Sequence, residues 1–154
     1  MIADEVPNGA TLQLGIGGVP NAVGVLLRDK KDLGLHTEMF TDSMVDLLEC
    51  GAVTNMKKPI NVGKTIATLA WGTKKMYEYM DDNPAFEMHP VDYTNNPYVI
   101  GQHDNFISVN ACVEIDLVRF VRNLWAHCIT AVPAVRWTSC AARTFPRAAR
   151  ALSR

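Results

Sequence analysis

Several features that would assign this sequence to a known class of protein are missing from it. No run approaches the roughly 18 apolar residues needed to cross a bilayer. Its four cysteines lie far apart with no C-x-x-C spacing, which argues against a zinc ribbon or a redox pair and suits free thiols. The N-terminus does not read as a secretory signal, because no basic segment precedes an apolar one. We therefore expect a cytoplasmic protein with no metal site.

Acidic residues are missing from one end of the chain. All 16 lie at or before Asp116, so residues 1–118, which have 8 basic residues, have a net charge of −8. Residues 119–154 contain 7 arginines but no lysine and no acid, which gives +7. A basic tail is typical of nucleic-acid or membrane contact. The same composition also arises when a gene is read out of frame.

Strand-like and helix-like segments alternate along the first two-thirds of the chain. Short apolar runs predict strands at residues 11–16, 34–40, 65–71, 86–92 and 106–116, the last with a Ser/Asn interruption. Helical periodicity predicts helices at residues 20–27, 42–50 and 73–80. We expect Asp42 or Ser43 to cap the second of these helices and residues 93–97 to form a turn. This alternation predicts an α/β fold, with a mostly parallel sheet and crossover helices.

A glycine-rich turn joins the first predicted strand to the first predicted helix. Gly15, Gly17 and Gly18 would let backbone N–H groups approach an anion or a carbonyl oxygen with no Cβ in the way. Pro20 stands where the dinucleotide-binding fingerprint has its third glycine, which makes a dinucleotide-binding domain a poor match. A tight turn without any ligand fits the same residues.

Glu38 lies near the end of the second predicted strand. Ligands of open parallel sheets bind beyond the carboxyl ends of the strands. A carboxylate there can attack a thioester carbonyl and form a mixed anhydride, while glycine amides stabilise the charge on the oxygen. A solvated surface glutamate is the simpler reading of Glu38 alone. His36 suits a structural, supporting role, and Asp42 suits a helix cap better than a catalyst.

Six ordered segments together resemble the acetyl-CoA hydrolase/transferase family, and in particular its 4-hydroxybutyrate and butyrate CoA-transferases. They are residues 9–23, 30–42, 72–77, 82–84, 89–93 and 99–105. The resemblance implies two similar α/β domains with the active site between them, of which this chain would be an incomplete second domain. It also implies that Glu38 carries a covalent glutamyl-CoA thioester. The oxyanion and CoA-binding groups map onto Gln13, Gly15, Gly17 and Gly18, and we take His36 and Asn21 as supporting residues.

The activity implied by this resemblance is transfer of coenzyme A between an acyl-CoA and a short-chain carboxylate such as acetate, butyrate or 4-hydroxybutyrate. The CoA thioester is then a substrate, and no cofactor is permanently bound. Intact relatives suggest a homo-oligomer, with no nucleic-acid or membrane partner. Acyl-CoA hydrolysis is an alternative, as is a non-catalytic remnant or a subunit that needs a separate partner domain. Ser43, Gly101 and His103 depart from the family pattern, which bears on the choice of substrate.

The resemblance ends abruptly after Leu117. Residues 120–140 can be back-translated and read one nucleotide earlier as VCSESVGTLHYSGSGGQVDFV, which matches the glycine-rich segment expected there. We therefore expect residues 1–118 to be a partial CoA-transferase domain. Residues 119–154 would be a frameshifted, poorly ordered basic tail, and the activity of the chain would be impaired. A natural basic arm is the alternative.

Overall fold

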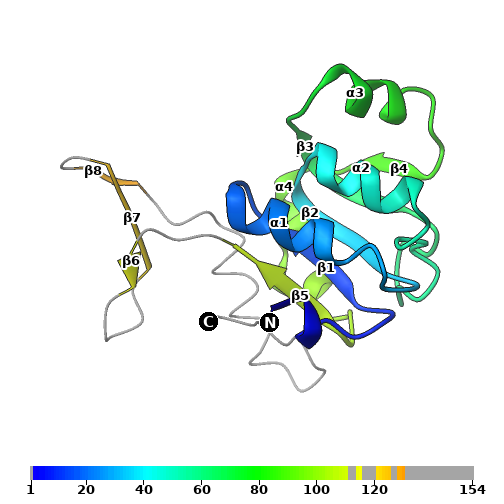
Figure 1. Cartoon of the computed structure of the whole chain (residues 1–154), viewed down its shortest axis with the longest axis horizontal. Coiled ribbons are helices and arrows are strands. Elements are labelled where there is room, and N and C mark those ends of the chain that lie inside the picture. Colours follow the sequence, from blue (N-terminus) through cyan, green and yellow to red (C-terminus); the bar gives the residue numbers. More distant parts are fainter. Residues whose placement is uncertain (1, 111–113, 116–120, 126–127, 131–154) are drawn as a thin grey trace.

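Five parallel strands form the central sheet of the computed structural model, which describes residues 2–110, 114–115, 121–125 and 128–130 (Figure 1). The strands are β1 (Thr11–Leu14), β2 (Gly34–Phe40), β3 (Thr65–Ala70), β4 (Phe86–Met88) and β5 (Phe106–Val109). They pair in the order β4-β3-β2-β1-β5, with every pair parallel. A second, antiparallel sheet contains β6 (Glu114–Ile115), β7 (Val121–Trp125) and β8 (Cys128–Thr130). The predicted α/β fold with a parallel sheet is confirmed.

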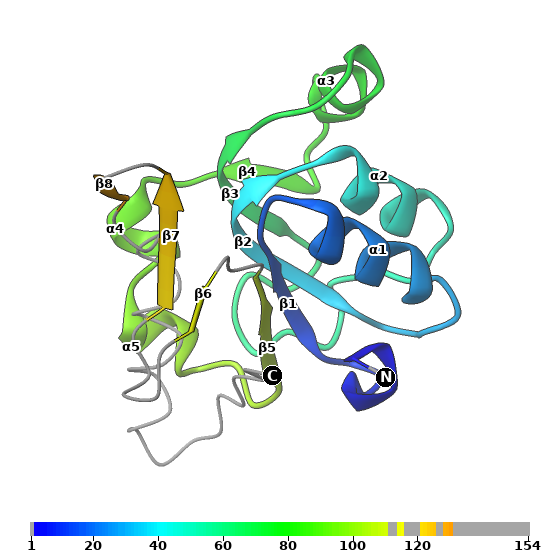
Figure 2. The same cartoon turned by 60° about the vertical axis from the view of Figure 1, so that its left-hand side comes forward.

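Helices cover both sides of the central sheet. Helices α1 (Gly18–Leu26) and α2 (Asp42–Glu49) lie on one side, whereas the one-turn helices α4 (Val91–Thr94) and α5 (Pro97–Ile100) lie on the other (Figure 2). The chain begins with the short 3-10 helix η1 (Ile2–Glu5), and α3 (Lys74–Met80) follows β3. None of the helices in the described residues combines the length and apolar character needed to cross a membrane.

The two faces of the sheet carry different side chains, because alternate residues of a strand point to opposite sides. The side covered by α1 and α2, which we call the apolar face, includes the buried side chains of Leu12, Leu14, Leu35, Ala67, Ile107 and Val109. The side covered by α4 and α5, which we call the polar face, carries the buried Ile66 and Phe106 but also most of the polar strand residues: Thr11, Gln13, His36, Glu38, Thr68 and Ser108. The core that holds the sheet to its helices is therefore on one face, and most polar strand residues are on the other.

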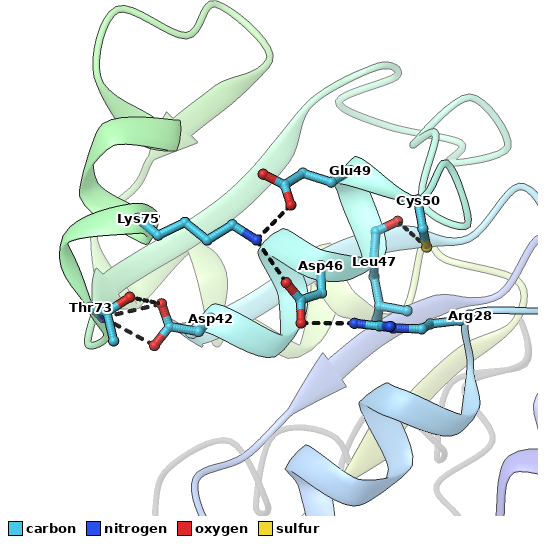
Figure 3. Close-up of polar contacts among 8 residues, drawn as sticks. All are labelled: Arg28, Asp42, Asp46, Leu47, Glu49, Cys50, Thr73 and Lys75. Atoms are coloured by element: carbon cyan, nitrogen blue, oxygen red, sulfur yellow. Dashed lines mark hydrogen bonds and ion pairs between the residues drawn. The ribbon is translucent and has the colours of Figure 1, made fainter.

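The start of α2 differs from the prediction. Thr41 is the N-cap, with an extended backbone (φ −137°, ψ 165°), and no side chain caps the helix. Asp42 is already helical, so its carboxylate is free to accept instead from the N–H of Thr73 at 3.0–3.1 Å and from the Thr73 hydroxyl at 2.8 Å (Figure 3). The prediction that Asp42 or Ser43 caps α2 is therefore wrong. Asp42 ties the start of α2 to Thr73, the N-cap of α3.

The segment from 86 to 97 is less extended than predicted. Strand β4 ends at Met88, and the chain then forms α4 and α5 where a strand and a turn were expected. Each helix begins beside a proline, and the Asn96 side chain caps α5 by accepting from Tyr98 N–H at 2.9 Å. One-turn helices are too short to leave a helical period in the sequence. The expected disorder of residues 119–154 stays a prediction, since most of that segment lies outside the described residues.

Candidate active site

Glu38 lies near the carboxyl end of β2, the middle strand of the sheet, and its side chain is half-buried. Its Oε2 accepts a hydrogen bond from Asn95 Nδ2 at 2.7 Å. Asn95 is only 7% exposed and lies between α4 and α5. A buried amide therefore holds one oxygen of the carboxylate and fixes the direction in which the other oxygen points.

His36, two residues before Glu38 on the same face, supports the same corner. Its Nε2 donates to the carbonyl oxygen of Thr94 at 2.8 Å, next to Asn95. Strand β2 thus holds the α4–α5 corner at two points, through His36 and through Glu38. Burial lowers the pKa of His36 to about 4, so the ring is neutral at ordinary pH. A ring that is 1% exposed and bonded to the backbone supports the site rather than acting as its base.

His103 extends this buried group toward the amino end of β1. Its ring lies 5.2 Å from that of His36, between centroids, and its Nδ1 is 3.4 Å from the hydroxyl of Thr11. The side chain is fully buried, and that burial lowers its pKa to about 3. The second imidazole is therefore also neutral, and it packs beneath the site rather than at its surface.

Gln13 belongs to a polar cluster on β1 and β5. Its Oε1 accepts from the hydroxyl of Ser108 and from Asn110 Nδ2, the latter at 2.9 Å. Asn110 Nδ2 also lies 2.9 Å from Ser108 Oγ, and Gln13 Nε2 lies 3.3 Å from Asn110 Oδ1. Gln13 is thus locked on the same face as Glu38, with its amide bonded inside the cluster.

The glycine turn forms where it was predicted, but its amides are not equivalent. Gly15 N–H already donates to Val109 O at 2.8 Å. A Cβ at Gly15 would lie 2.3 Å from Asn110 Oδ1, so this position needs glycine for close packing. Gly17 has φ +123°, which also favours glycine, and Gly18 begins α1. The N–H groups at the start of a helix have no intrahelical acceptor, which leaves Gly17 and Gly18 as the donors of the turn.

Glu38 and the glycine turn share an edge of the sheet rather than a face. The hydroxyl of Thr37 donates to Leu14 O at 3.4 Å, so the ends of β1 and β2 lie side by side. The turn, however, leads into α1 on the apolar face, whereas Glu38 lies with Asn95 on the polar face. Asn21 lies in the first turns of α1, where it is exposed and accepts from Ser43 Oγ at 3.4 Å, away from Glu38.

Three residues of this site were not among the candidates from the sequence: Asn95, Ser108 and Asn110. The Ser/Asn interruption in the last predicted strand was the signal for two of them, because polar residues in a buried strand need partners. Asn95 left no such signal, since it lies in a segment read as a turn. Asn95 is 57 positions from Glu38 in the sequence, and only the fold brings it to the site.

Two cavities lined by described residues lie away from Glu38. One is lined by Thr11, Asp32, Asp104 and Asn105 among others, and a second by residues 28–32 and 50–52. Neither of these two cavities includes Glu38, Gln13 or a glycine of the turn. The same residues contain no group of three or more His, Cys, Asp or Glu side chains placed to hold a metal ion.

Comparison with known proteins points to one family. Residues 72–123 match the family model described as the acetyl-CoA hydrolase/transferase C-terminal domain. The chain is 54% identical over 117 residues to succinyl-CoA:cyclohexane-1-carboxylate CoA transferase from Geobacter metallireducens, covering 76% of this chain and 27% of that protein. It is 47% identical over 116 residues to 4-hydroxybutyrate coenzyme A transferase from Clostridium kluyveri, covering 75% of this chain and 27% of that protein.

A solved structure matches the fold over nearly the whole chain. The crystal structure of RipA from Yersinia pestis superposes with a TM-score of 0.85 at 39% identity, covering 97% of this chain and 33% of that one. The chain therefore spans about a quarter of the length of the curated relatives it matches and a third of this solved structure.

Proposed function

This chain belongs to the acetyl-CoA hydrolase/transferase family, and we propose that it carries the nucleophile of a CoA-transferase that exchanges coenzyme A between an acyl-CoA and a short-chain carboxylate. The nucleophile is Glu38. One observation supports this assignment above the others: a half-buried carboxylate at the carboxyl end of the middle strand, with one oxygen held by Asn95 at 2.7 Å. The buried Asn95 amide fixes one carboxylate oxygen before any substrate arrives, which supports a role for Glu38 as nucleophile.

The first half of the proposed reaction transfers coenzyme A to the enzyme. A Glu38 oxygen attacks the thioester carbonyl carbon, the C–S bond breaks, and the CoA thiolate leaves behind an acyl-glutamyl anhydride. The thiolate then attacks the glutamyl carbonyl carbon, and the original acid leaves as its carboxylate. The product is a glutamyl-CoA thioester, formed without water and without net uptake of a proton.

The second half runs the same steps with the acceptor acid. Its carboxylate attacks the glutamyl thioester, the thiolate leaves, and thiolate attack on the acceptor's carbonyl regenerates the Glu38 carboxylate. Each attack places negative charge on a carbonyl oxygen. The free amides of Gly17 and Gly18, at the positive end of α1, are the donors we assign to the substrate carbonyl. Gln13 provides a polar side chain of fixed orientation beside the substrate, since its amide is bonded to Ser108 and Asn110.

Chemical trapping tests the nucleophile directly. The chain, joined to the first α/β domain that the family resemblance implies, is incubated with butyryl-CoA, treated with borohydride, digested and analysed by mass spectrometry. We expect Glu38 to be converted to the corresponding alcohol, because borohydride reduces thioesters and anhydrides but not free carboxylates. Glu38→Gln should abolish the product, whereas Glu49→Gln, which changes an exposed glutamate on α2, should leave it intact.

Two results would count against the proposal. If butyryl-CoA binds, as measured by calorimetry, but Glu38 stays unmodified, then Glu38 is not the nucleophile. If free CoA is released at the same rate with and without added acetate, the reaction is hydrolysis, the alternative raised by the sequence. Acetate-dependent formation of acetyl-CoA identifies the transferase.

The division of the chain and its setting are further parts of the proposal. We place the partial CoA-transferase domain in residues 1–118 and assign residues 119–154 to a frameshift. The cytoplasm and a homo-oligomeric assembly with the missing domain are the setting that we infer for the active enzyme. Resequencing the gene tests the frameshift: an unbroken reading frame through codons 117–119 and the same tail in near relatives would contradict it.

A further inference from the structure

Three buried polar atoms have no hydrogen-bond partner among the described residues: His36 Nδ1, Thr68 Oγ1 and His103 Nε2. The two ring nitrogens belong to the buried histidines beneath the site. Thr68 is different, because its strand neighbour on the same face is Glu38. A buried hydroxyl without a partner costs free energy, so native proteins rarely leave one unpaired.

The strand register places Thr68 beside Glu38. Strands β2 and β3 pair Thr37 with Ala67 and Met39 with Leu69, so the residues between them, Glu38 and Thr68, lie level with each other. Paired residues of parallel strands point to the same face, and neighbouring strands are about 4.8 Å apart. The structure itself has no hydrogen bond between the two side chains, so contact requires rotation about the Thr68 Cα–Cβ bond and within the longer Glu38 side chain.

One carboxylate oxygen of Glu38 is available to accept a hydrogen bond. Asn95 occupies Oε2, and Oε1 has no partner among the described residues. A carboxylate accepts at both oxygens, whereas the Thr68 hydroxyl has one hydrogen to donate. The unused donor and the unused acceptor are therefore on adjacent strands, at the same level and on the same face.

We propose that Thr68 is a positioning residue whose hydroxyl donates a hydrogen bond to Glu38 Oε1, so that Asn95 and Thr68 hold the carboxylate between them. The catalytic meaning of this contact rests on the proposed function, because it matters to the reaction only if Glu38 is the nucleophile. Held at both oxygens, the carboxylate keeps one orientation toward an incoming thioester and loses little freedom on reacting.

The contact can be measured without turnover. Chain labelled with ¹³C at the glutamate carboxyl carbon is titrated by NMR, and the Glu38 signal is identified by its loss in Glu38→Gln. In Thr68→Val, which keeps the β-branched shape and removes the hydroxyl, we expect the midpoint of the Glu38 signal to move to higher pH by roughly one unit. Thr68→Ser keeps a hydroxyl and should leave the midpoint in place.

A matched control separates this effect from general loss of stability. Thr54 Oγ1 donates to Asp32 Oδ1 at 3.3 Å, in the loop before β3, and Thr54→Val removes that hydroxyl without touching the site. It should not move the Glu38 midpoint. The proposal is wrong if Thr68→Val leaves the midpoint unchanged, or if Thr68→Ser moves it as far as Thr68→Val does.

Failure of this proposal and failure of the proposed function give different results. If Glu38 is trapped by borohydride but its NMR midpoint is the same in Thr68→Val, then Glu38 is the nucleophile and Thr68 does not position it. If the titration responds to Thr68 as expected but no thioester is trapped, the contact is real and the catalytic assignment of Glu38 is wrong.

Discussion

The two faces of the central sheet are held together by different forces. On the apolar face, side chains of β1, β2, β3 and β5 are buried against α1 and α2, and none of these contacts depends on direction. On the polar face, Gln13, Ser108 and Asn110 form one closed cluster, and His36 and Glu38 hold the α4–α5 corner. Each polar group there must find its own partner.

This difference separates stability from chemistry. The apolar face gains free energy in proportion to the area it buries and tolerates small shifts. The polar face gains little net free energy from its hydrogen bonds but loses much if one partner is removed. In return, its side chains are fixed in place before any substrate arrives, which is what a nucleophile such as Glu38 requires.

Truncation on the apolar face should have the largest effect on stability. Leu35 is 0% exposed, and Leu35→Ala should lower the free energy of unfolding by about 2–5 kcal/mol, because it leaves a cavity between the sheet and its helices. Urea denaturation followed by circular dichroism measures the loss. Val25, on α1, is 55% exposed, so Val25→Ala is the control and should lower the free energy of unfolding by less than about 0.5 kcal/mol. Equal losses in the two variants would show that the apolar face is not the core.

Acidic pH should lower the free energy of unfolding chiefly through the two buried histidines of the polar face. Burial lowers the pKa of His36 to about 4 and of His103 to about 3, whereas both titrate near 6.5 once the chain is unfolded. The unfolded chain therefore binds more protons between these values, so stability is fully present above about pH 6.5 and is lost as pH falls toward 4. Between about pH 7 and pH 5 each histidine should cost about 2 kcal/mol.

One variant identifies the histidines as the cause. His36→Gln keeps an N–H that can reach Thr94 O but does not titrate, so urea midpoints measured at the two pH values should differ about half as much as in the parent chain. Asp46 and Glu87, whose pKa values are held below the usual range by Lys75 and His89 as their first causes, also lose stability in acid. These two carboxylates lose that stability at lower pH than the range between pH 7 and pH 5. A pH dependence unchanged in His36→Gln would contradict the assignment.

The sequence predicts the apolar face well and the polar face poorly, for a physical reason. Apolar runs and helical periods are local, so they located β2 at residues 34–40 and α1 after the glycine turn. Polar partners are chosen across the fold: Asn95 reaches Glu38 from 57 residues away, and Asp42 accepts from Thr73 rather than capping its own helix. Residues 91–100 form helices of a single turn, which have no period to detect.

Resemblance to a family supplied what local patterns could not. The family motif strengthened Glu38, already a candidate from its place near a strand end, and it alone pointed to Gln13; the structure places both on the polar face near the carboxyl ends of their strands. Asn21 was chosen in the same way but lies on α1 beside Ser43. A motif identifies residues that occur together in a family, whereas the direction of each side chain depends on the strand or helix that carries it.

Removing a member of the Gln13 cluster should lower the free energy of unfolding by a moderate amount. Ser108→Ala removes the hydroxyl that donates to Gln13 Oε1 and accepts from Asn110 Nδ2, so stability should fall by about 1–2 kcal/mol. Asn110→Ala and the double variant complete a mutant cycle in urea denaturation. Ser43→Ala is the control, because its hydroxyl contacts Thr41 Oγ1 at 3.1 Å and Asn21 Oδ1 at 3.4 Å and touches no member of the cluster. Additive losses would show that the cluster does not act as a unit.

The smallest effect should come from the ion pairs on the outer surface of the helices. Lys75 Nζ lies 2.9 Å from Asp46 and 2.6 Å from Glu49, and Arg28 lies 2.9 Å from Asp46, which links the region after α1 to α2 and α3 (Figure 3). These side chains are 37–51% exposed, so water and salt screen their attraction almost completely. Lys75→Gln should therefore leave the urea midpoint within the error of measurement.

Raising the salt concentration distinguishes screening from compensation in that variant. If screening explains the small effect, the parent chain and Lys75→Gln should stay together from low to high salt. If instead the pairs contribute and some other change offsets their loss, the two proteins should separate at low salt, where surface charges interact over longer distances. A clear separation would mean that polar contacts on the apolar-face helices contribute as much as the buried ones on the polar face, and the contrast between the two sides of the sheet would not hold.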